Sequence, residues 1–250
     1  MLRNLSKALK PLAFALCALV LVACASSAKK KAEADVYLQL GVRYLSMNKL
    51  EVAKENLERV LSMDSNNVQA HNALGFLYEK IEKYPEARTH YQTAFKLAPD
   101  DLSIQNNFGR FLCERREFDQ GMELLGKAIA NLLNDRLWLA LTNAGLCQSG
   151  MGQQQKAKAY FKQALQVNSN YAPALLEMQK ISYQNREYWL AKNYLQRYVS
   201  LAPQTAESLW IAIQTERALG NYGLANEYHN ELLEKFPLSN QARQAGPVQQ

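Results

Sequence analysis

The sequence predicts an all-α protein assembled from a repeat of about 34 residues. Glycine and proline together contribute only 18 of 250 residues, about 7%, where average usage gives roughly 12%, so a β-sandwich or barrel would lack tight turns. Apolar residues make up 48% of the chain and charged residues 21%, which suits a folded protein with a substantial core. Small residues recur at one spacing, and this recurrence identifies the repeat.

Two series of small residues define the repeat. The series are Gly41, Gly75, Gly109, Gly145 and Ala53, Ala87, Gly121, Ala157, Ala191, Ala225. Both keep a spacing of 34 residues, apart from one step of 36 that follows the third member. A fixed period of this length indicates stacked units that share a continuous core. The phase gives six repeats, at residues 34–67, 68–101, 102–137, 138–171, 172–205 and 206–239.

The second repeat shows the pattern most clearly, with Leu74-Gly75, Tyr78, Tyr84, Ala87, Tyr91, Ala94 and Pro99. Small residues let two antiparallel helices approach, aromatic residues fill the space around their crossing, and proline ends the second helix. This pattern resembles the tetratricopeptide repeat. The resemblance implies a right-handed superhelix, or solenoid, of six helix-turn-helix repeats, whose first helices line a concave surface.

Three departures from the regular pattern lead to further expectations. The two extra residues fall near residues 134–137, so we expect the array to divide there into two subdomains of about three repeats each. Gln179 and Ile213 occupy positions of the small residues, so we expect looser or shifted packing around them. Residues 240–250 have no apolar face and are expected to form a disordered tail.

The first 23 residues have the layout of a secretory signal peptide. Three basic residues precede an uncharged apolar run from Leu12 to Ala23, which is shorter than the roughly 20 residues that a membrane-spanning helix needs. The run ends in Leu-Val-Ala before Cys24. This ending resembles the lipobox of bacterial lipoproteins and implies acylation of Cys24. An ordinary secretory peptide with an incidental cysteine is the alternative.

Residues 24–33 are interpreted as the lipidated cysteine and a flexible tether. An aspartate directly after the lipidated cysteine resembles a signal for retention in the inner membrane. This chain has Ala25 at that position. We therefore expect the protein to be anchored by lipid to the periplasmic face of the outer membrane.

Charge and motifs argue against nucleic-acid binding and catalysis. Residues 1–23 hold three of the 29 basic residues and no acidic residue, so the net charge of the remainder is only +3 and does not indicate nucleic-acid binding. The histidines show no metal-ligand spacing, and no zinc motif, phosphate loop or nucleophile elbow occurs. We expect no enzyme activity, no cofactor, no metal and no small-molecule substrate.

Two cysteines remain beyond Cys24 and the signal segment. Cys113 and Cys147 lie 34 residues apart, in the first helices of the neighbouring third and fourth repeats. An oxidising compartment and neighbouring helices favour a disulfide between them. The alternative is a pair of buried free thiols that act as small apolar side chains.

The first helices supply the candidate partner-binding residues. In the first repeat, Leu38, Val42 and Leu45 would place three apolar anchors on the concave face. The surface would continue through Gln69, Asn72, Phe76, Lys80, Asn106 and Arg110. Such a groove suits a helix or strand of another protein. The alternative is that the N-terminal segment covers the apolar anchors as a cap.

Four segments narrow the resemblance further. They are NNFGRFLC (106–113), NAGLC (143–147), AESLWIAIQTERALGN (206–221) and LLEKFP (232–237). These segments are similar to those of the type IV pilus biogenesis lipoproteins, the pilotins of the pilus secretin. The resemblance implies an adaptor that binds secretin subunits and promotes their multimerisation in the outer membrane. A lipoprotein of the β-barrel assembly machine, or an activator of a peptidoglycan synthase, is the alternative.

Overall fold

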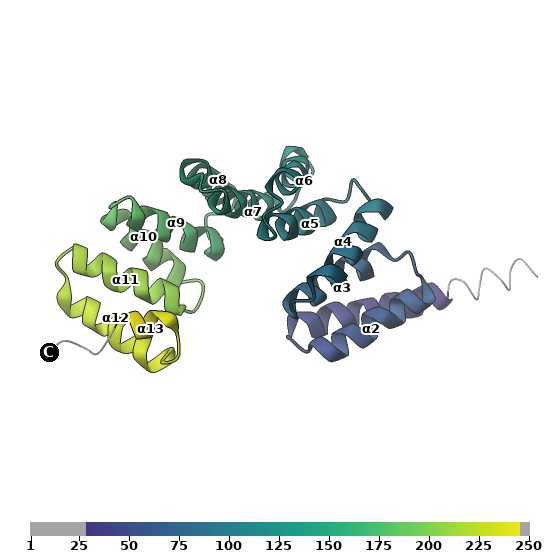
Figure 1. Cartoon of the computed structure of the whole chain (residues 1–250), viewed down its shortest axis with the longest axis horizontal. Coiled ribbons are helices and arrows are strands. Elements are labelled where there is room, and N and C mark those ends of the chain that lie inside the picture. The colour runs from purple at the N-terminus through teal and green to yellow at the C-terminus, as the bar shows by residue number, and fades with distance from the viewer. Residues whose placement is uncertain (1–28, 246–250) are drawn as a thin grey trace, which may run out of the picture. The chain divides into compact units, whose positions relative to one another are not determined.

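The computed structural model describes residues 29–245, and these residues form consecutive helical hairpins (Figure 1). Residues 29–46 are helical and precede the other helices. Those helices are α2 (Leu50–Met63), α3 (Val68–Lys80), α4 (Tyr84–Leu97), α5 (Leu102–Glu114), α6 (Phe118–Ala130), α7 (Leu137–Gly150), α8 (Gln154–Val167), α9 (Ala172–Gln184), α10 (Tyr188–Val199), α11 (Ala206–Ala218), α12 (Tyr222–Lys235) and α13 (Asn240–Ala245). Residues 29–245 contain no strand. The predicted all-α fold of paired helices is confirmed.

The chain divides into two compact units at a place that the sequence did not predict. The first unit extends to Asn107 and the second begins at Phe108, so the boundary lies inside α5. We predicted a division between the third and fourth repeats, and this prediction is wrong. The disulfide between Cys113 and Cys147 lies within the second unit.

Each hairpin within residues 29–245 closes through the same type of turn. One residue adopts a left-handed conformation, with φ between 57° and 78°, at Asn48, Glu82, Arg116, Gly152, Arg186 and Gly220. In the second repeat, Glu82 N–H donates to the Glu79 carbonyl at 3.0 Å, and Lys83 N–H donates to the Tyr78 carbonyl at 2.9 Å. This pair of bonds is the Schellman motif, which satisfies carbonyl groups at a helix end. The left-handed residues follow the same spacing as the small residues, including the single step of 36.

In the first unit, small residues bring the helices of each hairpin into contact. A Cβ atom added to Gly41 would lie 2.7 Å from the Leu57 side chain, and one added to Gly75 would lie 2.8 Å from the Tyr91 ring. Tyr91 is fully buried, and its hydroxyl donates to Glu79 Oε2 at 2.9 Å. The close approach therefore packs the aromatic ring against backbone while its polar end keeps a hydrogen bond.

In the second unit the same packing recurs from α5 to α12. A Cβ atom added to Gly145 would lie 2.5 Å from the Phe161 ring, which is fully buried. Gln179 and Ile213 are also fully buried, and Gln179 Nε2 donates to the Ser208 carbonyl at 3.2 Å. Both larger side chains are therefore enclosed in the core, and the expectation of looser or shifted packing stays a prediction. The glutamine amide finds a backbone partner in α11, so a larger side chain is accommodated there.

The N-terminal end of the described chain is helical where we predicted a flexible tether. Residues 29–33 belong to the helix that continues to residue 46, so the tether prediction is wrong for them. Alanine, lysine and glutamate are strong helix formers. Ala34 follows and is buried against Val60 and Ala70, which holds this end of the helix on α2 and α3.

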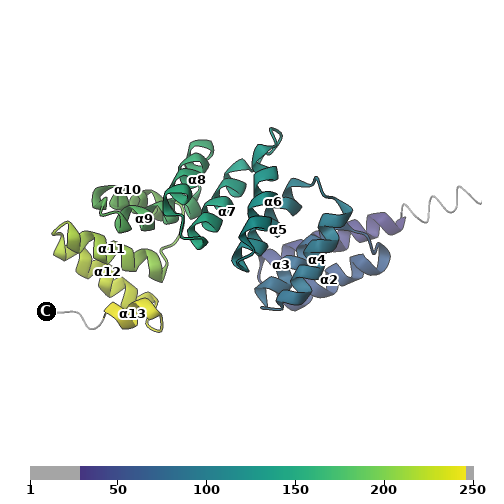
Figure 2. The same cartoon turned by 45° about the horizontal axis from the view of Figure 1, so that its top comes forward.

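The C-terminal tail also departs from prediction. Residues 240–245 form α13, which contacts α11 and α12 (Figure 2). Ala242 is buried beside Leu209, Ile213 and Leu232. Ser239 Oγ accepts the Ala242 N–H at 3.0 Å and caps the helix. The prediction of a disordered tail is wrong for residues 240–245 because one small apolar residue and one cap dock this short helix.

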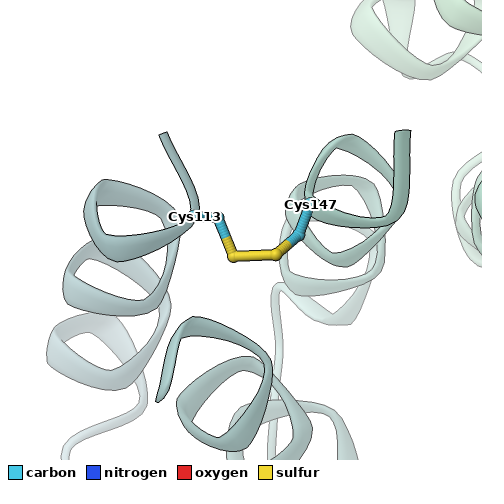
Figure 3. The surroundings of a disulfide bond; sticks show 2 residues. All are labelled: Cys113 and Cys147. Atoms are coloured by element: carbon cyan, nitrogen blue, oxygen red, sulfur yellow. A yellow bond between two sulfur atoms is a disulfide. The ribbon is translucent and has the colours of Figure 1, made fainter. Parts of the chain in front are cut away.

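The disulfide joins α5 to α7 (Figure 3). The Cys113 and Cys147 sulfur atoms are 2.01 Å apart, and the Cα atoms are separated by 5.3 Å. Both cysteines are buried and pack with Leu125 and Ala144. Gly121 of α6 lies directly against the Cys113 sulfur, where no side chain would fit. The bond thus connects two helices, α5 and α7, and α6 packs against it.

Substitution of two helical glycines by alanine should have opposite effects. Gly145→Ala forces a Cβ into the buried Phe161 ring and should lower the free energy of unfolding by about 1–3 kcal/mol. Gly126, in α6, has nothing within 4 Å of an added Cβ, so Gly126→Ala should raise it by about 0.5–1 kcal/mol. Urea unfolding followed by circular dichroism measures both. Equal effects at the two sites would contradict the packing argument.

Reduction of the disulfide should destabilise the second unit. The bond closes a loop of 34 residues, which corresponds to about 3.8 kcal/mol in the chain-entropy model. Urea unfolding with and without reductant should therefore show a markedly lower midpoint in reductant. A variant with Cys113→Ala and Cys147→Ala is the control, because its midpoint should not respond to reductant. An unchanged midpoint for the parent chain would show that the bond contributes nothing.

Candidate partner-binding site

The predicted apolar anchors of the first unit differ in their exposure. Val42 is 48% exposed, Leu38 is half-buried, and Leu45 is only 7% exposed. Leu45 packs with Leu57 and Leu74 in the core, so its assignment to an open groove is wrong. Around the helix, Val42 lies about 100° from Gly41, at the exposed edge of the stripe that also contains Leu38 and Leu45. Val42 is the anchor that remains available to a partner.

The predicted surface continues on α3 through Phe76 and Lys80. Phe76 is half-buried and packs against the core cluster that contains Leu45. Lys80 Nζ lies 5.6 Å from the centre of the Phe76 ring and 3.4 Å from Asn48 Oδ1. The ammonium group therefore covers one aromatic face and links α3 to the turn that follows residues 29–46.

Polar residues of the predicted surface are connected to one another within the first unit. Gln69 Nε2 donates to Asp101 Oδ2 at 3.2 Å, and Asn107 Nδ2 donates to Asn72 Oδ1 at 3.2 Å. Asn106 is buried and donates to Asn107 Oδ1 at 3.3 Å. Asn106 is thus an internal support of this surface, whereas Gln69 is exposed.

Arg110 belongs to the second unit and lies at a cavity that the sequence did not predict. Arg110 Nη1 lies 2.6 Å from Glu114 Oε1. The cavity has a volume of about 440 Å³ and is bordered by Asn143, Leu146, Phe118 and the disulfide. The spacing of the cysteines predicted the disulfide, but no periodic pattern in the sequence predicts the cavity beside it.

His71 and His90 form a contact that their spacing did not reveal. Their Nδ1 atoms lie 2.9 Å apart, and His71 Nε2 lies 3.1 Å from the Ser65 carbonyl. The Tyr78 ring stacks on His90 at 5.4 Å between centroids. Burial lowers the pKa of His90, and the neighbouring His71 lowers it further. Of the two facing Nδ1 atoms, one carries the hydrogen atom and donates it, and the other accepts.

Several predictions concern parts of the chain outside residues 29–245. The signal segment 1–23, Cys24 and the tether up to residue 28 all lie there. In the described part, none of the helices has the length and apolar character needed to cross a membrane. Over the same residues, histidine, cysteine and acidic side chains form no cluster of three that could hold a metal ion.

Comparison with known proteins agrees with this architecture. The tetratricopeptide repeat family model matches residues 140–171, and the model of the tetratricopeptide repeat protein 21 C-terminal ARM domain matches residues 15–104. The chain is 29% identical over 203 residues to the type IV pilus assembly protein PilF of Pseudomonas aeruginosa, with 81% of each protein covered.

Two solved structures have the same arrangement of helices. The structure of Pseudomonas aeruginosa PilF superposes with a TM-score of 0.75 at 27% identity, covering 86% of this chain and 97% of PilF. The structure of PilW, described as a widely conserved type IV pilus biogenesis factor, superposes with a TM-score of 0.74 at 27% identity, covering 84% and 97%. This chain is therefore a tetratricopeptide repeat homologue of the type IV pilus biogenesis proteins PilF and PilW.

Proposed function

We propose that this protein is an outer-membrane lipoprotein adaptor, a pilotin, which binds subunits of the type IV pilus secretin and promotes their localisation and multimerisation. The observation that carries the proposal is the similarity to PilF over 81% of the chain. Tetratricopeptide repeats form scaffolds for protein interaction, and the residues that the structure describes form such a scaffold. A role in pilus biogenesis follows from the homology, and the secretin and the lipid anchor are the proposed additions.

The first unit supplies the proposed binding surface. Val42 is exposed beside the half-buried Leu38 on the first helix, and Phe76 with Lys80 extends the surface onto α3. An apolar segment of the secretin would bury Val42 and the open edge of Phe76, while Gln69 and Lys80 offer polar contacts at the rim. This arrangement fits a short helix or strand with a few apolar side chains.

The proposed mechanism needs no chemistry. A subunit held on a scaffold that is itself attached to the membrane has an effective concentration in the mM range for a short flexible link. Multimerisation is then favoured, because each subunit meets the next one at the bilayer. Acylation of Cys24 would supply the attachment, and lipoprotein modification adds enough acyl chains for stable anchoring.

Replacement of the proposed lipidation site separates location from fold. Cys24→Ala should remove fatty-acid labelling and sharply reduce secretin multimers in the outer membrane. Because Cys24 precedes all of the described helices, the helical circular dichroism of the variant should match that of the parent chain. Normal secretin multimers in cells that carry this variant would contradict the mechanism.

A charged residue at Val42 tests the binding surface. Val42→Asp should weaken binding of the purified secretin subunit at least tenfold, since burial of a valine contributes about 1.5–3 kcal/mol. Val167→Asp is the matched control, because Val167 is also 48% exposed but lies in α8 of the second unit. Isothermal titration calorimetry measures both variants. Equal affinity for the two variants would place the contact elsewhere.

A further inference from the structure

We propose that the loop between α6 and α7 contacts the membrane directly, with Leu132 and Leu133 inserted among lipid acyl chains. Leu132 is fully exposed and Leu133 is 88% exposed. Two adjacent leucines with this exposure are unusual, since soluble proteins seldom leave neighbouring large apolar side chains in water without a function. The loop also contains the step of 36 residues that interrupts the regular repeat.

The loop is held in shape by its own asparagines. Asn131 Oδ1 accepts the Leu133 N–H at 2.8 Å, and Asn134 Oδ1 accepts the Arg136 N–H at 2.9 Å. Asn134 Nδ2 donates to the Ala128 carbonyl at 2.8 Å, at the end of α6. These bonds fix the conformation of the loop, from which the two leucines project into solvent. Little conformational entropy is then lost when the loop binds.

Other loops between repeats provide an internal comparison. The corresponding segments at 64–67, 98–101 and 168–171 read DSNN, APDD and NSNY. None of these three segments contains leucine, isoleucine, valine or methionine. The fourth such segment, at 200–205, reads SLAPQT, and its Leu201 is 44% exposed. Adjacent leucines occur in none of these four segments, so the pair at 132–133 is not needed to close a loop between repeats.

Lipid fits this loop better than a protein pocket does. Protein hot spots are rich in tryptophan, tyrosine and arginine, whereas leucine is under-represented in them. The charges near the leucines balance, because Asp135 and Arg136 are adjacent and Lys127 Nζ lies 2.7 Å from Glu123 Oε1. Leucines bordered by asparagines match the boundary between acyl chains and headgroups, where polar side chains remain hydrated.

The contact would act together with an anchor on Cys24, and it rests in that respect on the proposed function. Two leucine side chains bury fewer methylene groups than a myristoyl chain, which by itself binds membranes only marginally. The loop alone would not retain the protein on a bilayer. On a chain that is already attached to the membrane by lipid, the local concentration of the loop at the bilayer is high. The same weak contact would then orient the second unit at the membrane surface.

Site-specific photocrosslinking in cells tests the proposal. The full chain carries p-benzoylphenylalanine at position 133 or, as a control, at position 238, since Leu238 is 87% exposed but has no adjacent leucine. After irradiation, mass spectrometry should find phospholipid adducts at position 133 with a yield at least tenfold above that at position 238. Adducts to a polypeptide in place of lipid, or equal yields at the two positions, would overturn the proposal.

A second part of the experiment tests whether the two leucines are responsible for the lipid contact. With the crosslinker at position 135, Leu132→Ser combined with Leu133→Ser should reduce the yield of lipid adduct at least tenfold, whereas Leu238→Ser should leave it unchanged. An unchanged yield in the double variant would overturn the role of the leucines. Both leucines are exposed, so the variant should keep its helical circular dichroism.

The same samples distinguish this proposal from the proposed function. Fatty acid on Cys24 is measured on each chain by mass. A lipid adduct at position 133 without fatty acid on Cys24 would overturn the anchor and leave the loop contact standing. An absent adduct on chains that carry fatty acid on Cys24 overturns the loop contact and leaves the anchor standing, whereas chains that lack both the fatty acid and the adduct overturn the anchor on which the loop contact rests.

Discussion

The close approach of two helices within each hairpin is the constraint on which the rest of the structure depends. A Cβ atom at Gly41, Gly75 or Gly145 would lie within 2.8 Å of a buried side chain from the partner helix. Contacts this short admit only the smallest side chains. In the first four repeats the crossing point therefore fixes the position of a glycine, whereas Gln179 and Ile213 fill the corresponding places in the last two repeats. The turn that returns the second helix must keep a constant length in every repeat. The Schellman turns meet this requirement, because the left-handed residue recurs at the same spacing.

This constraint explains why the extra residues of the chain lie where they do. An insertion inside a hairpin would shift the small residues out of contact. The two additional residues instead lengthen the connection between α6 and α7, residues 131–136, and the regular spacing resumes with α7. The disulfide joins α5 to α7 elsewhere, because Cys147 lies ten residues beyond the start of α7 and so about 15 Å along the helix from this connection. A longer connection that lies outside the helix crossings is free to take on side chains that the core does not need, and Leu132 and Leu133 are such side chains.

The sequence predicted the hairpins well because the period is steric. Small residues at a spacing of 34 are visible without any knowledge of the structure, and the helix bounds follow them closely. Side chains on the first helix were harder to assign, because Leu45 lies only three residues from Val42 and yet faces the core. The two ends of the described chain were even harder to predict. A tail with a single buried alanine, Ala242, has no apolar stripe to detect, and residues 29–33 show helix propensity without an apolar period.

The early start of the first helix changes what a lipid on Cys24 would do. A tether over residues 24–33 could extend roughly 30 Å. Residue 29 is already helical, so only five peptide units separate Cys24 from the helix. Their reach is at most about 18 Å. This distance is less than the thickness of the hydrocarbon core of a bilayer, which is roughly 30 Å. Lys30 and Lys31 are exposed near this helix end, so anionic headgroups would lie within their reach at about 1 kcal/mol each. An adaptor confined this closely would hold a bound subunit at the surface it must enter, and even modest affinity for that subunit would then be sufficient.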